Sequence, residues 1–222
     1  GGRAGTLLAS ATSFEVKVTG KGGHAAMPHL SVDPVAAAAK IIVEAQTLVS
    51  RELNPLAPGV VSVTMVRAGE TFNVIPPDVV LRGTIRSLTH EGAAFLKRRL
   101  AEIAEGVARA NRCQARVEFP EVSYPPTVND DALWRFAQEV AGEMLGRENV
   151  REIPPVMGGE DFSFFAERVP GVFAFLAVGD ERTGQAYPVH HPKFTINEDA
   201  LPVGAALHAA FALRSLDELS GG

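Results

Sequence analysis

The stretch SFEVKVTGKGGHAAMPHLSVDP, residues 13–34, joins a strand pattern, a glycine-rich loop and a helix start. Apolar and polar residues alternate over 14–19, which predicts a half-buried strand. The Asp-Pro pair at 33–34 predicts a helix with Asp as its N-cap. Three glycines in 20–23 precede His24, and we expect them to take positive φ and to present the imidazole to a cleft. The alternative is a loop histidine that is merely solvated.

Outward from this stretch the pattern reads strand, helix, strand, strand, helix, strand. The first helix is expected to bury Val35, Ala38, Ile42, Ala45 and Val49. The second, capped by a threonine at 89, is expected to bury Leu96, Leu100, Ile103, Val107 and Ala110. This order is that of the split βαβ, or ferredoxin-like, fold, with an antiparallel four-stranded sheet covered on one face by two helices. An open edge strand of such a sheet is available for pairing with a second copy.

The remaining part, residues 123–222, predicts helices and a buried strand. Asn129 is expected to cap a helix, and a final helix is expected to begin near Asp199. The apolar run 172–178, which ends in Gly-Asp at 179–180, predicts a strand buried on both faces. Such a strand needs neighbours on both sides, so we expect this part to complete a larger sheet.

Composition excludes several functions. The net charge is −5 and the basic residues are scattered, which argues against a nucleic-acid partner. No apolar run approaches the length of a membrane span, and no signal peptide is visible, so no membrane partner is expected. The single cysteine, Cys113, excludes an internal disulfide and fits a reducing compartment. We therefore expect a cytoplasmic protein.

Five motifs occur in order along the chain: Gly20–His29, Phe72–Pro76, Gly83–Arg86, Gly158–Phe162 and His190–Phe194. Together they resemble the family of dinuclear-metal amidohydrolases that includes hippurate hydrolase, N-acyl-amino-acid amidohydrolases, plant auxin-conjugate hydrolases and, more distantly, glutamate carboxypeptidases. The resemblance covers essentially the whole chain. It implies an α/β protein in which a ferredoxin-like lid, which also dimerises, interrupts a zinc-peptidase-like α/β catalytic domain.

The resemblance also implies the domain organisation. Residues 1–12 would be a linker, 13–122 the lid and dimerisation domain, and 123–222 the C-terminal part of the catalytic domain. The family's N-terminal part carries a His-x-Cys-Gly-His-Asp stretch and a Glu-Glu pair, which have no counterpart in this sequence. Those residues would supply most metal ligands and the general base, so the resemblance implies a fragment that is inactive alone.

Five residues match functional positions of the family. His190 matches a metal-ligand histidine. His24 resembles the lid histidine that stabilises the oxyanion in a closed active site, often that of the dimer partner. Asn73 and Arg86 resemble the lid's substrate clamps, and a guanidinium fork suits a free α-carboxylate. Glu160 is a candidate for orienting the metal ligands.

Plainer alternatives stay open for each of these side chains. They are a polar-loop histidine for His190, a helix cap for Glu160, a turn asparagine for Asn73 and a solvated arginine for Arg86. The other histidines outside these motif roles are expected to be structural or solvated: His29, His90 and His208.

The resemblance implies a metal-dependent amidohydrolase that cleaves N-acyl or N-aroyl amino acids with metal-activated water. Two divalent ions (zinc, manganese, cobalt or nickel) would serve each active site of the intact enzyme. A homodimer would form through the lid. The alternative function is a non-catalytic, self-associating ferredoxin-like module.

Overall fold

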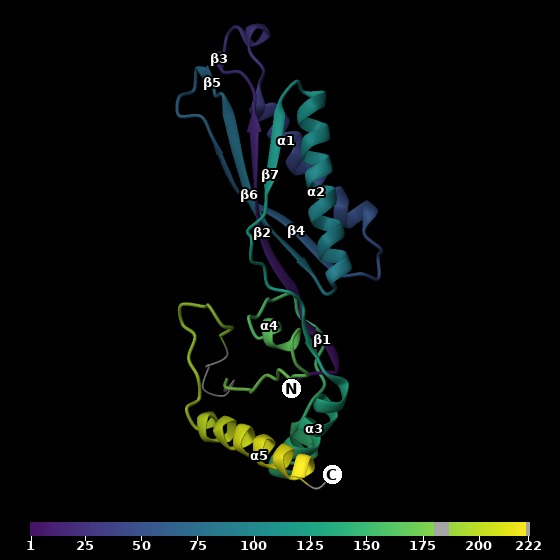
Figure 1. Ribbon diagram of the computed structural model, residues 1–222. Coiled ribbons are helices and arrows are strands. Elements are labelled where there is room, and N and C mark those ends of the chain that lie inside the picture. Colours follow the sequence, from purple (N-terminus) through teal and green to yellow (C-terminus); the bar gives the residue numbers. More distant parts are fainter. Residues whose placement is uncertain (180–186, 221–222) are drawn as a thin grey trace. The chain divides into compact units, whose positions relative to one another are not determined.

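The computed structural model describes residues 1–179 and 187–220, so Asp180 of the predicted strand end lies outside the described residues. The chain divides into two compact units (Figure 1). The lid unit comprises Leu8–Thr127 and Pro155–Phe164. The C-terminal unit comprises Gly1–Leu7, Val128–Pro154 and Phe165–Gly222. The boundaries expected from the sequence, after residues 12 and 122, stay predictions.

Four antiparallel strands form the sheet of the lid unit, in the order β4-β6-β2-β7. They are β2 (Ser10–Thr19), β4 (Gly59–Ala68), β6 (Asp78–Ser87) and β7 (Gln114–Glu118). Two helices connect them, α1 (Pro34–Ala45) and α2 (His90–Ala110). This order and topology confirm the ferredoxin-like prediction.

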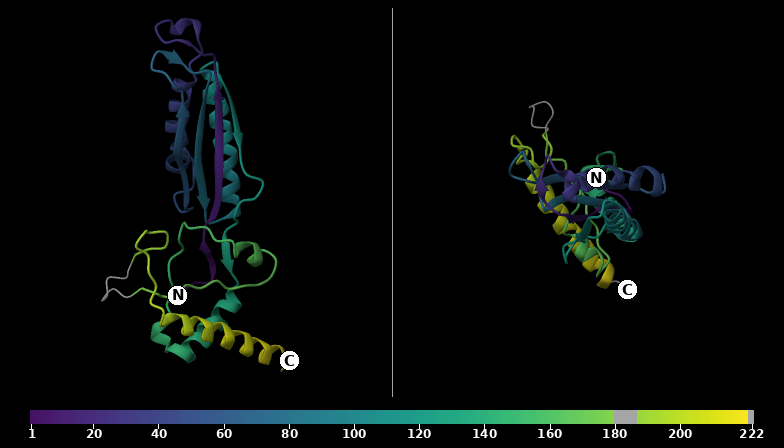
Figure 2. Two further views of the ribbon diagram at one scale, coloured as in Figure 1. Left: turned by 90° about the vertical axis from the view of Figure 1, so that its left-hand side faces the viewer. Right: turned by 90° about the horizontal axis from the view of Figure 1, so that it is seen from above.

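Both helices cover the same face of the sheet (Figures 1 and 2). Alternate residues of the strands point into this layer, and the largest buried side chains include Val16, Val18, Leu81 and Ile85. The opposite face carries the intervening charged residues, among them the ion pairs Lys17–Asp78 and Arg82–Glu15. The alternation of apolar and polar residues along the strands thus gives the sheet one buried face and one polar face.

Helix α1 begins where the Asp-Pro pair predicts. Asp33 Oδ1 accepts hydrogen bonds from the backbone N–H of Val35 (2.8 Å) and of the next residue. The predicted apolar stripe is confirmed at Ala38 and Ala45, which are buried. It is wrong at Val35 and Val49, which are exposed. The buried positions are Pro34, Ala37, Ala38, Ile41, Ala45 and, just beyond the helix, Leu48. The reason is that PVAAAAKIIVEA is apolar on both faces, so two stripes fit the helical period.

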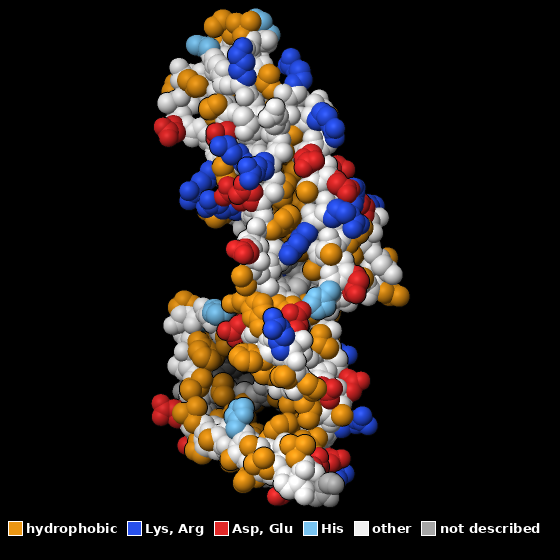
Figure 3. Space-filling model, in the orientation of Figure 1, with side chains coloured by type: hydrophobic (Ala, Val, Ile, Leu, Met, Phe, Trp, Pro, Cys, Tyr) orange, Lys and Arg blue, Asp and Glu red, His pale blue; other side chains and the backbone are white. Residues whose placement is uncertain are grey.

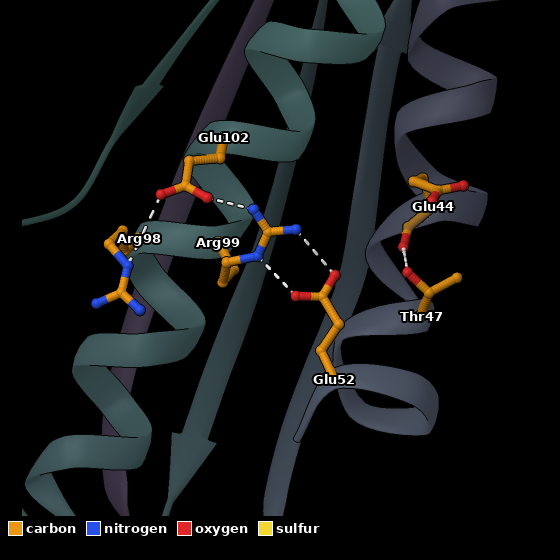
Figure 4. Close-up of polar contacts among 6 residues, drawn as sticks. All are labelled: Glu44, Thr47, Glu52, Arg98, Arg99 and Glu102. Carbon is orange, nitrogen blue, oxygen red and sulfur yellow. Dashed lines mark hydrogen bonds and ion pairs between the residues drawn. The ribbon is translucent and has the colours of Figure 1, made fainter. Parts of the chain in front are cut away.

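A five-residue π-helix, η2 (Leu48–Glu52), follows α1 and is tied to α2. Arg99 donates two hydrogen bonds to the Glu52 carboxylate, from Nε (2.6 Å) and Nη2 (3.0 Å), and a third to Glu102 of its own helix (Figure 4). Helix α2 begins as expected, because Thr89 Oγ1 accepts from the N–H of Gly92. Its stripe is largely as predicted, although Ala110 is exposed and Ala104 and Ala108 are buried.

Beyond the Asp78 end of β6 lies what we call the lid tip, residues 20–32 and 69–77. It contains a two-stranded sheet of β3 (Gly23–His24) and β5 (Val74–Ile75). It also contains one turn of 3-10 helix, η1 (Pro28–Leu30). The lid tip therefore joins two of the five sequence motifs.

The other elements are β1 (Gly5–Leu8), which pairs with β8 (Thr127–Asn129), α3 (Asp131–Leu145), η3 (Arg147–Asn149), α4 (Ser163–Ala166) and α5 (Ala200–Ser220). Helix α5 begins close to the predicted Asp199. Among the described residues, no helix combines the length and hydrophobicity needed to cross a bilayer.

Asp130, and not the predicted Asn129, caps α3. Its Oδ1 accepts from the N–H groups of the second and third helical residues, both at 2.9 Å. Asn129 is buried, and its side-chain amide bonds to both the N–H (2.7 Å) and the C=O (2.9 Å) of Phe173. An amide can donate and accept at once, whereas a carboxylate only accepts, so each residue suits the position it occupies.

The apolar run 172–178 is not a strand in this structure. Phe175 exchanges two backbone hydrogen bonds with Gly1, at 2.7 and 2.8 Å, while Phe175 and Leu176 stay 39% and 37% exposed. The prediction of a strand buried on both faces is therefore wrong for this chain. The residues that neighbour the run here cover too little of it to bury these side chains.

Candidate functional site

The lid tip brings the predicted residues His24 and Asn73 together. His24 pairs with Val74 across β3 and β5, and the N–H of Ala25 donates to the carbonyl of Asn73 at 3.0 Å. Both predicted side chains are exposed. The two motifs that carry them therefore form a single surface.

The glycines of the lid tip have a different role from the one expected. None of Gly20, Gly22 and Gly23 has positive φ, so that prediction is wrong. Instead, a Cβ at Gly20 would lie 2.2 Å from the carbonyl oxygen of Val32, and one at Gly22 would lie 2.9 Å from that of Ile75. These glycines permit close approach of two backbones, which holds the turn that carries the histidine.

The His24 side chain is fixed by one backbone bond. Its Nδ1 accepts a hydrogen bond from the N–H of Ala26 at 3.0 Å, and the Met27 N–H closes the turn onto the His24 carbonyl at 2.9 Å. Hydrophobic side chains and histidines gather at this end of the lid (Figure 3). The exposed apolar residues there are Met27, Leu30, Phe72 and Val74.

Arg86 lies at the opposite end of β6, eight residues beyond Asp78, or about 26 Å at the usual strand rise. The structure therefore does not bring it to His24 within one lid. Arg86 is half-buried, and this burial lowers the pKa of its guanidinium. Its Nη1 donates to the carbonyl of Ile85 at 3.0 Å, and it has no carboxylate partner among the described residues. A partly desolvated, unpaired guanidinium favours an anionic partner.

The motif containing Glu160 packs at the same end of the sheet as Arg86. Ala9 N–H donates to the carbonyl of Gly158 at 2.9 Å, and a Cβ at Gly159 would lie 2.6 Å from Cβ of Ala11. Ala11 is the partner of Arg86 in the strand register. The second glycine of the motif is thus required for contact with β2.

Glu160 itself forms the turn before α4. Its Oε1 accepts from the N–H of Asp161 at 3.0 Å, and its carbonyl accepts from the Ser163 hydroxyl at 2.6 Å. These contacts are those of a helix cap, which is the alternative role expected for Glu160 from the sequence. A role in orienting metal ligands stays a prediction.

His190, the predicted metal ligand, is exposed and has φ of 70°, which is uncommon for a residue other than glycine. The next residue, His191, is held more firmly. Its ring stacks on that of Tyr187 at 4.4 Å, and its Nδ1 accepts from the N–H of Lys193 at 3.1 Å. Within the described residues, no group of three or more His, Cys, Asp or Glu could hold a metal ion. A metal-ligand role for His190 stays a prediction.

One contribution to the site was not apparent from the sequence. Ala25 and Ala26 act through their backbone N–H groups, which side-chain patterns do not reveal. The sequence contained only a weak sign of this bond. Ala25 and Ala26 are small, so the His24 ring is free to turn back onto the chain.

A sequence profile of peptidase family M20/M25/M40 matches residues 8–214. The chain belongs to this family. Among the relatives, IAA-amino acid hydrolase ILR1-like 4 of Arabidopsis thaliana is 44% identical over 220 residues, which are 98% of this chain and 50% of that protein. N-acetylcysteine deacetylase of Bacillus subtilis is 38% identical over 220 residues, 99% and 56% of the two proteins. The chain thus spans about half the length of the curated relatives it matches.

Two solved structures agree with the fold. A putative aminohydrolase from methicillin-resistant Staphylococcus aureus superposes with a TM-score of 0.85 at 30% identity, covering 96% of this chain and 54% of that one. A Bacillus subtilis protein described as a dinuclear metal binding peptidase from the M20 family gives 0.77 at 30% identity, with 98% and 53% covered. The predicted family and the α/β fold class are both confirmed.

Proposed function

We propose that this chain supplies the lid and the C-terminal part of a metal-dependent amidohydrolase that cleaves the amide bond of N-acyl or N-aroyl amino acids. The observation that carries the proposal is the joining of His24 and Asn73 on one exposed surface of an M20 lid. The names of the relatives, an IAA-amino acid hydrolase and an N-acetylcysteine deacetylase, favour this substrate class.

Each lid residue has a proposed role in that reaction. His24 donates a hydrogen bond to the oxyanion that forms when the amide carbonyl is attacked, with Asn73 beside it. Arg86 binds the α-carboxylate of the substrate through its planar fork. The half-burial of Arg86 and its lack of a carboxylate partner in the described structure support this role.

The metal would come with residues that this chain does not contain. Two divalent ions, zinc, manganese, cobalt or nickel, would activate water and polarise the carbonyl. His190 would supply one ligand. Because a single imidazole does not make a useful metal site, we propose that the other ligands and the general base lie in a separate N-terminal portion. The isolated chain would then be inactive.

Two copies of the lid would serve one active site. His24 lies in the lid tip beyond the Asp78 end of β6, whereas Arg86 lies eight residues further along that strand. A small N-acyl amino acid is far shorter than this strand length of about 26 Å. We propose that one copy contributes His24 and Asn73 and the other contributes Arg86. A homodimer through the lid sheet would provide both.

Hippurate hydrolysis tests the proposal. The chain is assayed alone with zinc, manganese or cobalt, and again after mixing with an N-terminal portion from an M20 relative that carries the His-x-Cys-Gly-His-Asp stretch. Activity is expected only in the mixture. Turnover by the chain alone would contradict the assignment of the missing ligands. Proven association without any hydrolysis would favour the alternative, a self-associating ferredoxin-like module without catalysis.

A further inference from the structure

We propose that the backbone N–H of Ala26 is the group that makes His24 a hydrogen-bond donor, by holding its imidazole as the Nε2–H tautomer. This inference rests on the proposed function and deepens it. Ala26 would be a positioning residue, acting through His24 and not on the substrate itself.

The argument begins with the bond between the Ala26 N–H and His24 Nδ1, at 3.0 Å. A ring nitrogen can accept a hydrogen bond only when it carries no proton. In a neutral imidazole the other nitrogen then carries the single N–H. The bond therefore assigns the lone pair to Nδ1 and the donor to Nε2.

The surrounding backbone holds this bond in place. The turn is closed by the Met27 N–H on the His24 carbonyl at 2.9 Å, and the Ala25 N–H is anchored on the Asn73 carbonyl at 3.0 Å. His24 is also in register with Val74 of β5. The three consecutive N–H groups after His24 are thus all used, and each one restrains the same turn.

This arrangement selects among the roles open to a histidine. A general base needs a free lone pair at the nitrogen that faces the substrate, and a metal ligand needs one at the metal. Here the lone pair is turned back onto the chain. The exposed nitrogen carries a proton, as an oxyanion donor requires.

The histidines of this chain provide internal controls. His191 makes the same kind of bond, with its Nδ1 accepting from the Lys193 N–H at 3.1 Å. His29, in the lid tip, makes no such ring bond in the described structure. The inference therefore applies to His24 and His191 but not to His29.

Nuclear magnetic resonance of the 15N-labelled chain tests the bond directly. A scalar coupling across the hydrogen bond should join the Ala26 amide nitrogen to His24 Nδ1, and the His24 Nε2 shift should be that of a protonated nitrogen. His191 should show the corresponding coupling and His29 none. A His24 ring protonated on Nδ1, or one without the coupling while His191 shows it, would overturn the inference.

Replacing Ala26 by lactic acid converts its amide to an ester, in which an oxygen that cannot donate takes the place of the N–H group. The ring nitrogen shifts of His24 should then show both neutral tautomers in exchange, whereas the same replacement at Ala25, which removes the bond to Asn73, should leave His24 as the Nε2–H tautomer. In the assembled enzyme the Ala26 ester should lower kcat roughly fivefold with little change in KM, as for loss of one ordinary hydrogen bond. An unchanged kcat would overturn the positioning role.

The two proposals fail in different ways. If the coupling is absent but His24→Ala still lowers kcat, the positioning inference is wrong and the proposed function stands. If the coupling is present but His24→Ala leaves kcat unchanged, the bond exists and the proposed role of His24 in hydrolysis is wrong.

Discussion

His24 is held in the lid tip by backbone groups alone. One N–H fixes its ring, and glycines before it allow the turn to pack against neighbouring backbone. A side chain held in this way can be removed without opening the core, because it is exposed. Its contribution to chemistry and its contribution to folding should therefore separate cleanly on mutation.

His24→Ala in the assembled enzyme should lower kcat by about 10²–10³, the usual effect of removing one oxyanion donor. The midpoint of thermal unfolding and the metal content should stay close to those of the parent. The matched control is His29→Ala, which changes another exposed histidine of the lid tip and should leave kcat unchanged. Equal losses of stability and activity in His24→Ala would return this residue to the role of a solvated loop histidine.

Gly20→Ala should destabilise the lid by about 1–3 kcal/mol, because the added Cβ would lie 2.2 Å from the carbonyl oxygen of Val32 and force the backbone apart. Gly106→Ala is the control. Gly106 is inside α2 with nothing within 4 Å of its missing Cβ, so alanine should stabilise the helix by about 0.5–1 kcal/mol. Urea unfolding measures both. Equal effects of the two substitutions would refute the close-approach explanation.

The roles of single residues were predictable where their hydrogen-bond partners are close in the sequence. Asp33 and Thr89 cap the helices expected of them, since a cap bonds only to the turn that follows. Asn129 was misassigned because its true partner, Phe173, is distant in the sequence. The positive φ expected of the lid-tip glycines failed for the same reason: the backbone that approaches Gly20 belongs to Val32.

At the scale of elements, the junction of η2 with α2 has an electrostatic component. The Arg99 guanidinium holds the pKa of the Glu52 carboxyl below its usual value of 4.5. A carboxyl with a depressed pKa in the folded state stabilises the fold fully above its ordinary pKa. That contribution is lost as the pH falls through the lower, folded-state pKa.

Glu52→Gln should therefore lower the free energy of unfolding at pH 7, and the difference from the parent should shrink as the pH falls well below 4.5. The effect should be small, since both side chains are near solvent. Glu105→Gln, at an exposed position of α2, should change little at either pH. Urea unfolding followed by circular dichroism gives the comparison, and a pH-independent difference would contradict the ion-pair explanation.

Elements with a clear period were predictable, and ambiguous ones were not. The strand alternation of residues 14–19 led directly to the sheet, because one face is buried and the other is charged. The stripe of α1 was displaced because alanine and valine occupy both of its faces. The run 172–178 has the composition of a buried strand, but composition does not supply the neighbours that a strand needs.

At the scale of the whole molecule, we propose that the β4 edge of the lid sheet pairs with a second copy. In the described structure β4 pairs only with β6, and with ten residues it is a longer edge than β7, which has five. Apolar side chains are exposed along it and on α1, including Val66 (57%) and Val43 (68%). A long apolar edge of this kind favours strand pairing between copies.

The dimer prediction is tested by sedimentation. The parent chain should be dimeric at micromolar concentration, and Val66→Lys should shift it to monomer, because a charged side chain at an edge opposes pairing. Gln114→Lys, at the β7 edge, should stay dimeric. A monomeric parent, or dissociation caused only by Gln114→Lys, would contradict pairing through β4.

The candidate site was predictable only in part, because five motifs in order identify the family but not the distances between their residues. The joining of His24 to Asn73 follows from β3–β5 pairing across a long loop, and the separation of Arg86 follows from the length of β6. Neither the contact between His24 and Asn73 nor the separation of Arg86 from them can be read from the residues next to these positions in the sequence. Only the structure shows that His24 and Asn73 lie at one end of the lid and Arg86 at the other.

The most direct test of the proposed function is hydrolysis of an N-aroyl amino acid by the chain before and after addition of an M20 N-terminal portion, with metal present throughout. We predict no turnover by either part alone and turnover by the mixture that is abolished by a chelator. Hydrolysis by this chain alone, or a correctly associated mixture that remains inactive, would contradict it.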